Sequence, residues 1–125
     1  MRQRPVAIFK LRVLRFSEVY TEAHRRLILE RKEKPLIRGI GALWTYIDAR
    51  DAARACRIAL EAKFSGHQAF NICASETFME APTSELVKKY LLEVKLTRPI
   101  SGRESGYDVA KARRMLGFQA MLRLP

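Results

Sequence analysis

The order of strand-like and helix-like segments constrains the fold of this chain more than any other feature. Runs rich in Val, Ile, Phe and Leu alternate with segments of helical composition or periodicity. Because parallel strands are usually joined by a helical crossover, this alternation favours an α/β architecture with parallel strands. The 125 residues allow one ordinary domain and hardly two, and they contain no internal repeat or linker. The sequence therefore predicts a single α/β folding unit over residues 1–125.

The individual elements follow from apolar spacing and from residues that begin or end helices. Asp48 is placed to cap an alanine-rich helix that Gly66 closes, and Asp51 in its first turn is predicted to stabilise it rather than to take part in chemistry. Gly117 suits the left-handed position after the last helix. The remaining predicted elements are one long or two short strands over 5–19, a helix over 21–34, strands over 43–47 and 68–73, a helix capped by Thr83, an extended piece over 96–100, and a helix over 109–116 capped by Asp108.

Positive charge is in large excess and is unevenly distributed. The net charge is +11, and residues 1–38 contain 11 Lys and Arg against 4 Asp and Glu. Such an excess suits a polyanionic partner. The sequence lacks a Cys/His finger, a basic recognition helix and an aromatic-interleaved sheet motif, so nucleic acid is an unfavoured partner. A non-enzymatic basic module that binds nucleic acid or an acidic protein is the alternative function.

The sequence also bears on compartment and membrane contact. It has no apolar run of the roughly 20 residues that cross a bilayer, and Lys10 and Arg12 interrupt the first apolar stretch, which argues against a secretory signal. Two cysteines, Cys56 and Cys73, cannot build a disulfide framework and are expected to be buried, inert thiols. We therefore expect a cytoplasmic protein with no membrane partner.

Five segments follow one another in the order and spacing of a known family. They are 14–20 (LRFSEVY), 44–53 (WTYIDARDAA), 69–72 (AFNI), 83–86 (TSEL) and 108–118 (DVAKARRMLGF). The first resembles the strand LRxxNVYGP, the second the segment R-x-Y-I-x-V-x-D-x-A, and the third the strand xFN[IV], while the last two match the closing helices. Together they resemble the extended short-chain dehydrogenase/reductase family, the NAD-dependent epimerases and dehydratases, over nearly the whole chain.

The resemblance implies the C-terminal part of a Rossmann-like NAD(P)-binding fold with part of the small substrate-binding domain. The parent enzyme would transfer a hydride between NAD or NADP and a sugar-like or other hydroxyl substrate. The glycine-rich turn of the N-terminal dinucleotide-binding half has no counterpart, because Gly39 and Gly41 lead into a predicted strand. We therefore expect a fragment or truncated relative that is inactive alone and does not bind the cofactor alone.

The partner expected from this interpretation is either the missing N-terminal half or a second copy of the chain. Strands from the end of a parallel sheet, without their inner neighbours, keep an unpaired edge that can pair with another chain. At physiological ionic strength salt screens charge repulsion beyond about 8 Å. The interpretation therefore predicts that the isolated chain self-associates or is poorly soluble.

The resemblance assigns six residues to ligand sites: Phe16, Ser17, Glu18, Trp44, Arg98 and Arg103. Phe16 and Ser17 match the strand end beside the nicotinamide and the sugar. Glu18 replaces the usual asparagine, and Trp44 replaces an arginine that contacts a diphosphate in many epimerases. Both substitutions argue against an ordinary UDP- or dTDP-sugar. Either of the two later arginines could serve as the phosphate-binding arginine.

The catalytic Tyr-x-x-x-Lys pattern of the family occurs here only as Tyr107 to Lys111. This string follows the strand that the family's pair precedes. With Asp108 as the predicted cap, Tyr107 lies before the helix, so the two side chains would not share a helical face. We therefore predict no catalytic pair in the chain, and no metal site.

Overall fold

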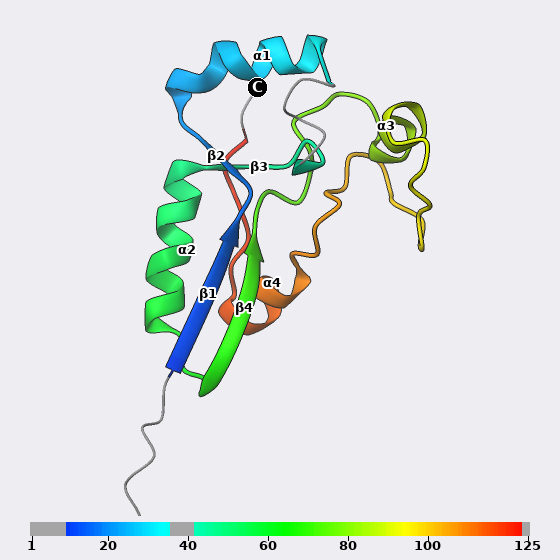
Figure 1. Cartoon of the computed structure of the whole chain (residues 1–125). Coiled ribbons are helices and arrows are strands. Elements are labelled where there is room, and N and C mark those ends of the chain that lie inside the picture. Colours follow the sequence, from blue (N-terminus) through cyan, green and yellow to red (C-terminus); the bar gives the residue numbers. More distant parts are fainter. Residues whose placement is uncertain (1–9, 36–41, 124–125) are drawn as a thin grey trace, which may run out of the picture.

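The structure is a computed structural model that describes residues 10–35 and 42–123. The described elements, in chain order, are β1 (Lys10–Phe16), β2 (Glu18–Tyr20), the short 3-10 helix η1 (Glu22–His24), α1 (Arg25–Glu33), β3 (Tyr46–Asp48), α2 (Ala49–Glu61), β4 (Gly66–Ile72), α3 (Thr83–Tyr90) and α4 (Ala110–Leu116). Figure 1 shows their arrangement. Strand and helix alternate along the chain, which confirms the predicted mixed α/β class.

The strands form two small parallel sheets. β1 pairs with β4 in a register that places Lys10 opposite Gly66 and Phe16 opposite Ile72, and β2 pairs with β3. Ser17 separates β1 from β2, so the predicted run is two strands rather than one. Parallel pairing brings the carboxyl ends of β1 and β4 to the same edge of their sheet.

Two apolar clusters form the core. One lies between α1, α3 and the β2–β3 sheet, and its largest fully buried side chains are Ile28, Trp44 and Phe78. The other joins Phe70 and Ile72 of β4 to the apolar faces of α2 and α4. Ala120, in the C-terminal segment, packs against both clusters. Residues 118–122 therefore tie the two halves of the core together.

The start of α2 confirms the predicted cap. Asp48 has an extended backbone, and its carboxylate accepts a hydrogen bond from the amide of Arg50 at 2.8 Å. The guanidinium of Arg50 also binds this carboxylate, with an Nη2–Oδ2 distance of 2.8 Å. Asp48 is only 1% exposed. Gly117, with φ of 66°, ends α4 in the predicted left-handed conformation.

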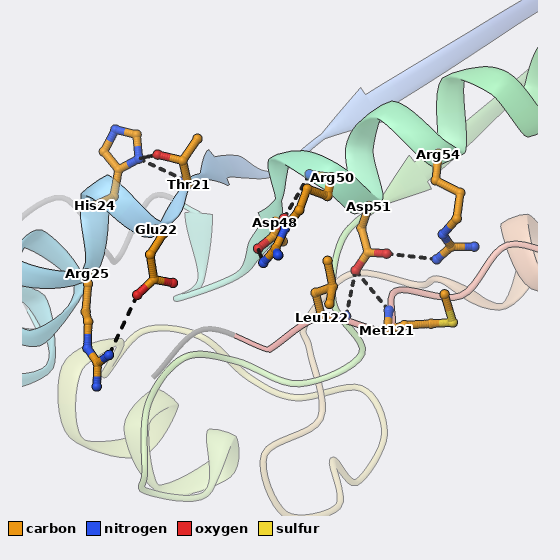
Figure 2. A network of polar contacts seen from close by, with 10 residues as sticks. All are labelled: Thr21, Glu22, His24, Arg25, Asp48, Arg50, Asp51, Arg54, Met121 and Leu122. Carbon is orange, nitrogen blue, oxygen red and sulfur yellow. Dashed lines mark hydrogen bonds and ion pairs between the residues drawn. The ribbon is translucent and has the colours of Figure 1, made fainter.

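Asp51 has the expected structural role, but its hydrogen bonds reach far beyond the first turn of its own helix. One carboxylate oxygen accepts the amides of Met121 and Leu122 at 2.9 and 2.8 Å. The other accepts a hydrogen bond from the guanidinium of Arg54 at 2.9 Å. Figure 2 shows this carboxylate between the first turn of α2 and the C-terminal segment. Asp51 therefore anchors residues 121 and 122 to a helix about seventy positions earlier.

Several predicted details were wrong. The predicted strand over 43–47 begins only at Tyr46, because Leu43 and Trp44 have φ of 50° and 57° in a turn. Thr83 is the first residue of α3 rather than its cap, and its hydroxyl instead donates to the carbonyl of Glu104 at 2.6 Å. α2 ends at Glu61, before Gly66, and residues 96–100 form no strand.

Some of the predictions concern residues that the structure does not describe, and one concerns membrane-spanning segments. Residues 5–9 of the first predicted strand, together with Gly39 and Gly41, lie outside the described residues. Within the described residues, none of the helices is long and apolar enough to cross a membrane.

Replacing Asp51 by alanine is expected to lower the free energy of unfolding by about 3 kcal/mol. The substitution leaves two amides and a guanidinium without their charged acceptor in a site where Asp51 is 1% exposed. Urea unfolding of the two proteins measures the difference. Asp108→Ala is the matched control, because its exposed carboxylate accepts one amide, that of Ala110, and it should cost about 1 kcal/mol. Equal losses for the two variants would contradict the anchoring role.

Asp48 is expected to make stability depend on acid pH. The hydrogen bonds from Arg50 lower the pKa of its carboxyl group in the folded state. Because the folded pKa is depressed, this stabilisation is present above the unfolded pKa of about 3.9 and is lost as the pH falls through the folded pKa. Wild type should therefore exceed Asp48→Asn in unfolding free energy at pH 6, and the difference should shrink below about pH 4. A difference that grows on acidification would contradict this assignment.

Candidate functional site

The candidate site lies where the carboxyl ends of β1 and β4 meet, the edge at which α/β sheets bind ligands. Two cavities adjoin there, and both are lined by Cys73 and Tyr107. The Phe16 cavity, of about 460 Å³, is completed by Arg15, Phe16, Ser17 and Asn71. The Arg98 cavity, of about 320 Å³, has largely apolar walls, and its polar side chains include Arg98, Ser105, Arg113 and Gln119.

A network of hydrogen bonds positions Tyr107 between the cavities. The amide of Ser105 donates to the carbonyl of Ser75 at 2.8 Å, next to the end of β4. The side chain of Asn71, on β4, donates to the carbonyl of Asp108 at 3.1 Å. The amide of Tyr107 donates to the hydroxyl of Ser105 at 3.1 Å. These bonds fix the loop along the end of β4 and leave the Tyr107 side chain on the wall of both cavities.

Phe16 and Ser17 are brought together in one cavity, as their adjacency at the end of β1 requires. Phe16 is 40% exposed, so its ring forms an accessible apolar surface. The hydroxyl oxygen of Ser17 is buried and has no hydrogen-bond partner within the described residues. Buried polar atoms in native proteins nearly always have a partner, so a ligand in the cavity would gain a hydrogen bond from this hydroxyl once the Ser17 side chain turns toward it.

Arg98 lines the other cavity, where a second arginine accompanies it. Arg98 forms an ion pair with Glu104 at 3.0 Å, and its hydrogen bond lowers the pKa of that carboxyl group. Arg113 reaches the same cavity from α4 and has no ion pair with a described residue. Sequence reasoning missed Arg113, because a basic residue in the last turn of a helix is common and carries no signal of its own.

Glu18 lies outside both cavities, in a cluster of buried polar groups. Its carboxylate binds the guanidinium of Arg31 and the hydroxyl of Tyr20, and Arg31 also contacts that hydroxyl. Burial raises the pKa of Tyr20, and the hydrogen bond to Glu18 raises it further. The charge of Glu18 is therefore matched by a cation within the protein, and it does not face a ligand in either cavity.

Trp44 and Arg103 are also separate from the two cavities. Trp44 is fully buried, and its indole nitrogen donates to the carbonyl of Pro35 at 3.1 Å. Arg103 donates to the carbonyl of Thr77 at 3.0 Å and lies 3.9 Å from the carboxylate of Glu76. Trp44 therefore packs the core, and Arg103 joins two loops.

As predicted, Tyr107 and Lys111 do not lie on one helical face as a catalytic pair would. α4 begins at Ala110, after Tyr107, and the amino group of Lys111 lies 5.2 Å from the centre of the Phe70 ring. No group of three or more His, Cys, Asp or Glu side chains that could bind a metal occurs in the described ranges.

The comparisons with protein-family models, curated proteins and solved structures find no significant match for this chain. The functional interpretation therefore depends on the residues and on the geometry of the site.

The two cysteines differ in environment, which corrects the prediction for one of them. Cys73 is buried, and its sulfur lies 3.8 Å from the hydroxyl of Ser105. Cys56 is exposed, because Ala52, Ala55 and Ala59 form the buried face of α2. Burial raises the pKa of the Cys73 thiol, although the hydrogen bond with Ser105 opposes this shift.

Cys73 is expected to react with a thiol reagent at least about tenfold more slowly than Cys56 at pH 8. Its raised pKa lowers the thiolate fraction, and burial limits access. The rates are measured with Ellman's reagent on Cys56→Ser and Cys73→Ser. Because the hydrogen bond with Ser105 lowers the pKa, Ser105→Ala should slow Cys73 further. Equal rates for the two thiols would show that Cys73 is accessible.

Proposed function

We propose that this chain forms the C-terminal, substrate-side part of a Rossmann-like NAD(P)-dependent oxidoreductase of the epimerase/dehydratase type. The observation that carries the proposal is the position of Phe16, which ends a parallel strand, and of Ser17, which directly follows it; both line a cavity that lies beside a second one. Dinucleotides and their substrates bind at this end of the strands in α/β sheets. The resemblance in sequence assigns the same two residues to the nicotinamide.

The residues of the Phe16 cavity fit the nicotinamide end of the cofactor. Phe16 offers an exposed ring, and Ser17 offers a buried hydroxyl that has no partner among the described residues. We propose that Phe16 packs against the nicotinamide and that Ser17 hydrogen-bonds its carboxamide. The bound nicotinamide would accept or donate the hydride.

The diphosphate of NAD or NADP requires other groups. It binds at a glycine-rich turn that opens a helix, where backbone amides approach the phosphates. The sequence contains no such turn. We therefore propose that a partner supplies the dinucleotide-binding half, and that the chain alone is catalytically silent.

The Arg98 cavity suits the hydroxyl substrate. Arg98, Ser105 and Arg113 supply hydrogen-bond donors to it, and its shared wall at Cys73 and Tyr107 adjoins the proposed nicotinamide position. Because Glu18 is paired outside both cavities, its charge does not disfavour a phosphorylated substrate, contrary to the argument from sequence alone. The substrate class is thus a sugar-like or other hydroxyl compound, with or without an anionic group.

The alternative, a basic module that binds a polyanion, receives less support. Four cations of α1 each have a carboxylate within 4 Å. The pairs are Arg25 with Glu22, Arg26 with Glu30, Arg31 with Glu18 and Lys32 with Glu80. Cations paired in this way do not form a free basic face on the helix, so an organised polyanion site is not favoured there.

We predict that nicotinamide mononucleotide binds the chain in the millimolar range and that NADH shows no micromolar binding. The mononucleotide tests the Phe16 cavity alone, whereas tight binding of NADH requires the absent diphosphate cradle. Amide NMR shifts should change for Ser17, Cys73 and Tyr107, and Ser17→Ala should weaken the effect. Calorimetry with NADH and assays of dehydrogenase and epimerase activity on the isolated chain should give no signal.

Adenosine monophosphate is the matched control, because it has the same phosphate and ribose without the nicotinamide. Equal shifts with both mononucleotides, or shifts of the first one away from the Phe16 cavity, would refute the assignment. Micromolar binding of NADH to the isolated chain would refute the proposal that a partner is required.

A further inference from the structure

The inner part of the Arg98 cavity is almost entirely apolar. The uncharged residues of its wall that are buried or half-buried are Cys73, Ser105, Val109, Phe118 and Ala120. Ser105 carries the one polar side chain among them, and its hydroxyl already accepts the amide of Tyr107 at 3.1 Å. Burial of apolar surface is favourable, whereas burial of an unpaired polar group costs free energy. This part of the wall therefore favours an apolar ligand surface over one with many hydroxyl groups.

The charges of the cavity lie toward solvent and balance one another. The charged residues of its described wall are two arginines and two carboxylates, namely Arg98, Arg113, Glu104 and Asp108. Arg98 is already matched, because one carboxylate oxygen of Glu104 lies 3.0 Å from its guanidinium. The other oxygen of Glu104 accepts the amide of Ser101 at 3.2 Å, which holds this carboxylate in place. The wall therefore offers no excess of positive charge to an anion such as a diphosphate.

The volume of the cavity is consistent with a small ligand. It is about 320 Å³, at the lower end of the range of about 300–1,000 Å³ for small-molecule sites. This volume suits a compound of one or two rings. The cavity also shares the wall at Cys73 and Tyr107 with the Phe16 cavity, so such a compound would lie beside the proposed nicotinamide position.

We propose that the Arg98 cavity binds an uncharged hydroxyl compound with an apolar ring, rather than a sugar or a nucleoside diphosphate. The ring would pack against Val109 and Phe118. Its oxygen would accept a hydrogen bond from the hydroxyl of Ser105, close to the wall shared with the Phe16 cavity. This inference rests on the proposed function, because it names the substrate class of that same site.

Three compounds built on the same six-membered carbon ring test the preference. Cyclohexanol has one hydroxyl group, myo-inositol has a hydroxyl group on every carbon, and cyclohexyl phosphate has a charged phosphate in place of the free hydroxyl. In amide NMR titrations of the chain, cyclohexanol should bind in the millimolar range and shift the signals of Ser105, Val109 and Phe118. Each of the other two compounds should bind at least about tenfold more weakly.

A cavity-filling variant tests where cyclohexanol binds. Ala110 is an exposed residue of the cavity wall at the start of α4, so Ala110→Phe should obstruct the cavity and weaken cyclohexanol at least about tenfold. The matched control, Ala53→Phe, makes the same change at an exposed position of α2 that lines neither cavity. Its effect should be under about twofold. Circular dichroism checks that both variants are folded.

A charge variant tests the balance of the wall. Glu104→Gln removes the charged partner of Arg98 and leaves two arginines against one carboxylate in the wall. Cyclohexyl phosphate should then bind at least about fivefold more tightly than it binds wild type, because one repulsive charge is gone. The affinity for cyclohexanol, which has no charge, should stay within about twofold.

Three results would overturn the proposal. One is binding of myo-inositol or cyclohexyl phosphate to wild type as tight as that of cyclohexanol, or no binding of cyclohexanol. Another is an equal loss in the Ala110→Phe and Ala53→Phe variants. The last is unchanged binding of cyclohexyl phosphate to Glu104→Gln. These titrations contain no nicotinamide, so they can fail while nicotinamide mononucleotide still binds the Phe16 cavity, and the two assignments are refuted by different experiments.

Discussion

The carboxylate of Asp51 connects the parts of this molecule on which the candidate site depends. It accepts two backbone amides from the C-terminal segment while it sits in the first turn of α2, buried from solvent. Because a buried carboxylate is stable only when its oxygens are well paired, the segment and the helix hold each other in place. Ala120 of the same segment contacts both core clusters and lines the Arg98 cavity. Loss of this anchor would therefore affect both the core and the cavity wall.

The site itself results from parallel pairing. The register of β1 against β4 places Ser17 and Cys73, each directly after a strand, at one edge of the sheet. Asn71 then binds the backbone at Asp108 and brings Tyr107 over that edge. Three segments distant in sequence thus line one cavity.

The residues that the resemblance assigned to ligands fall into two groups, those that line a cavity and those whose contacts lie inside the protein. Phe16, Ser17 and Arg98 line cavities, whereas Glu18 and Trp44 have their interaction partners inside the protein. A substitution in a family pattern can therefore reflect a new internal contact rather than a new substrate. Glu18 is paired with Arg31, a cation that lies thirteen residues away and that no local motif connects to it.

The sequence by itself determined the features that depend on neighbouring residues. The cap at Asp48, the left-handed Gly117 and the alternation of strands and helices rest on bonds and sterics within a few positions, or on apolar periodicity. Only the tertiary structure decided the reach of Asp51 to residue 121, the burial of Trp44, the exposure of Cys56 and the place of Arg113 in a cavity. These depend on sheet register and on how helices pack, where partners are tens of residues apart and local sequence carries no record of them.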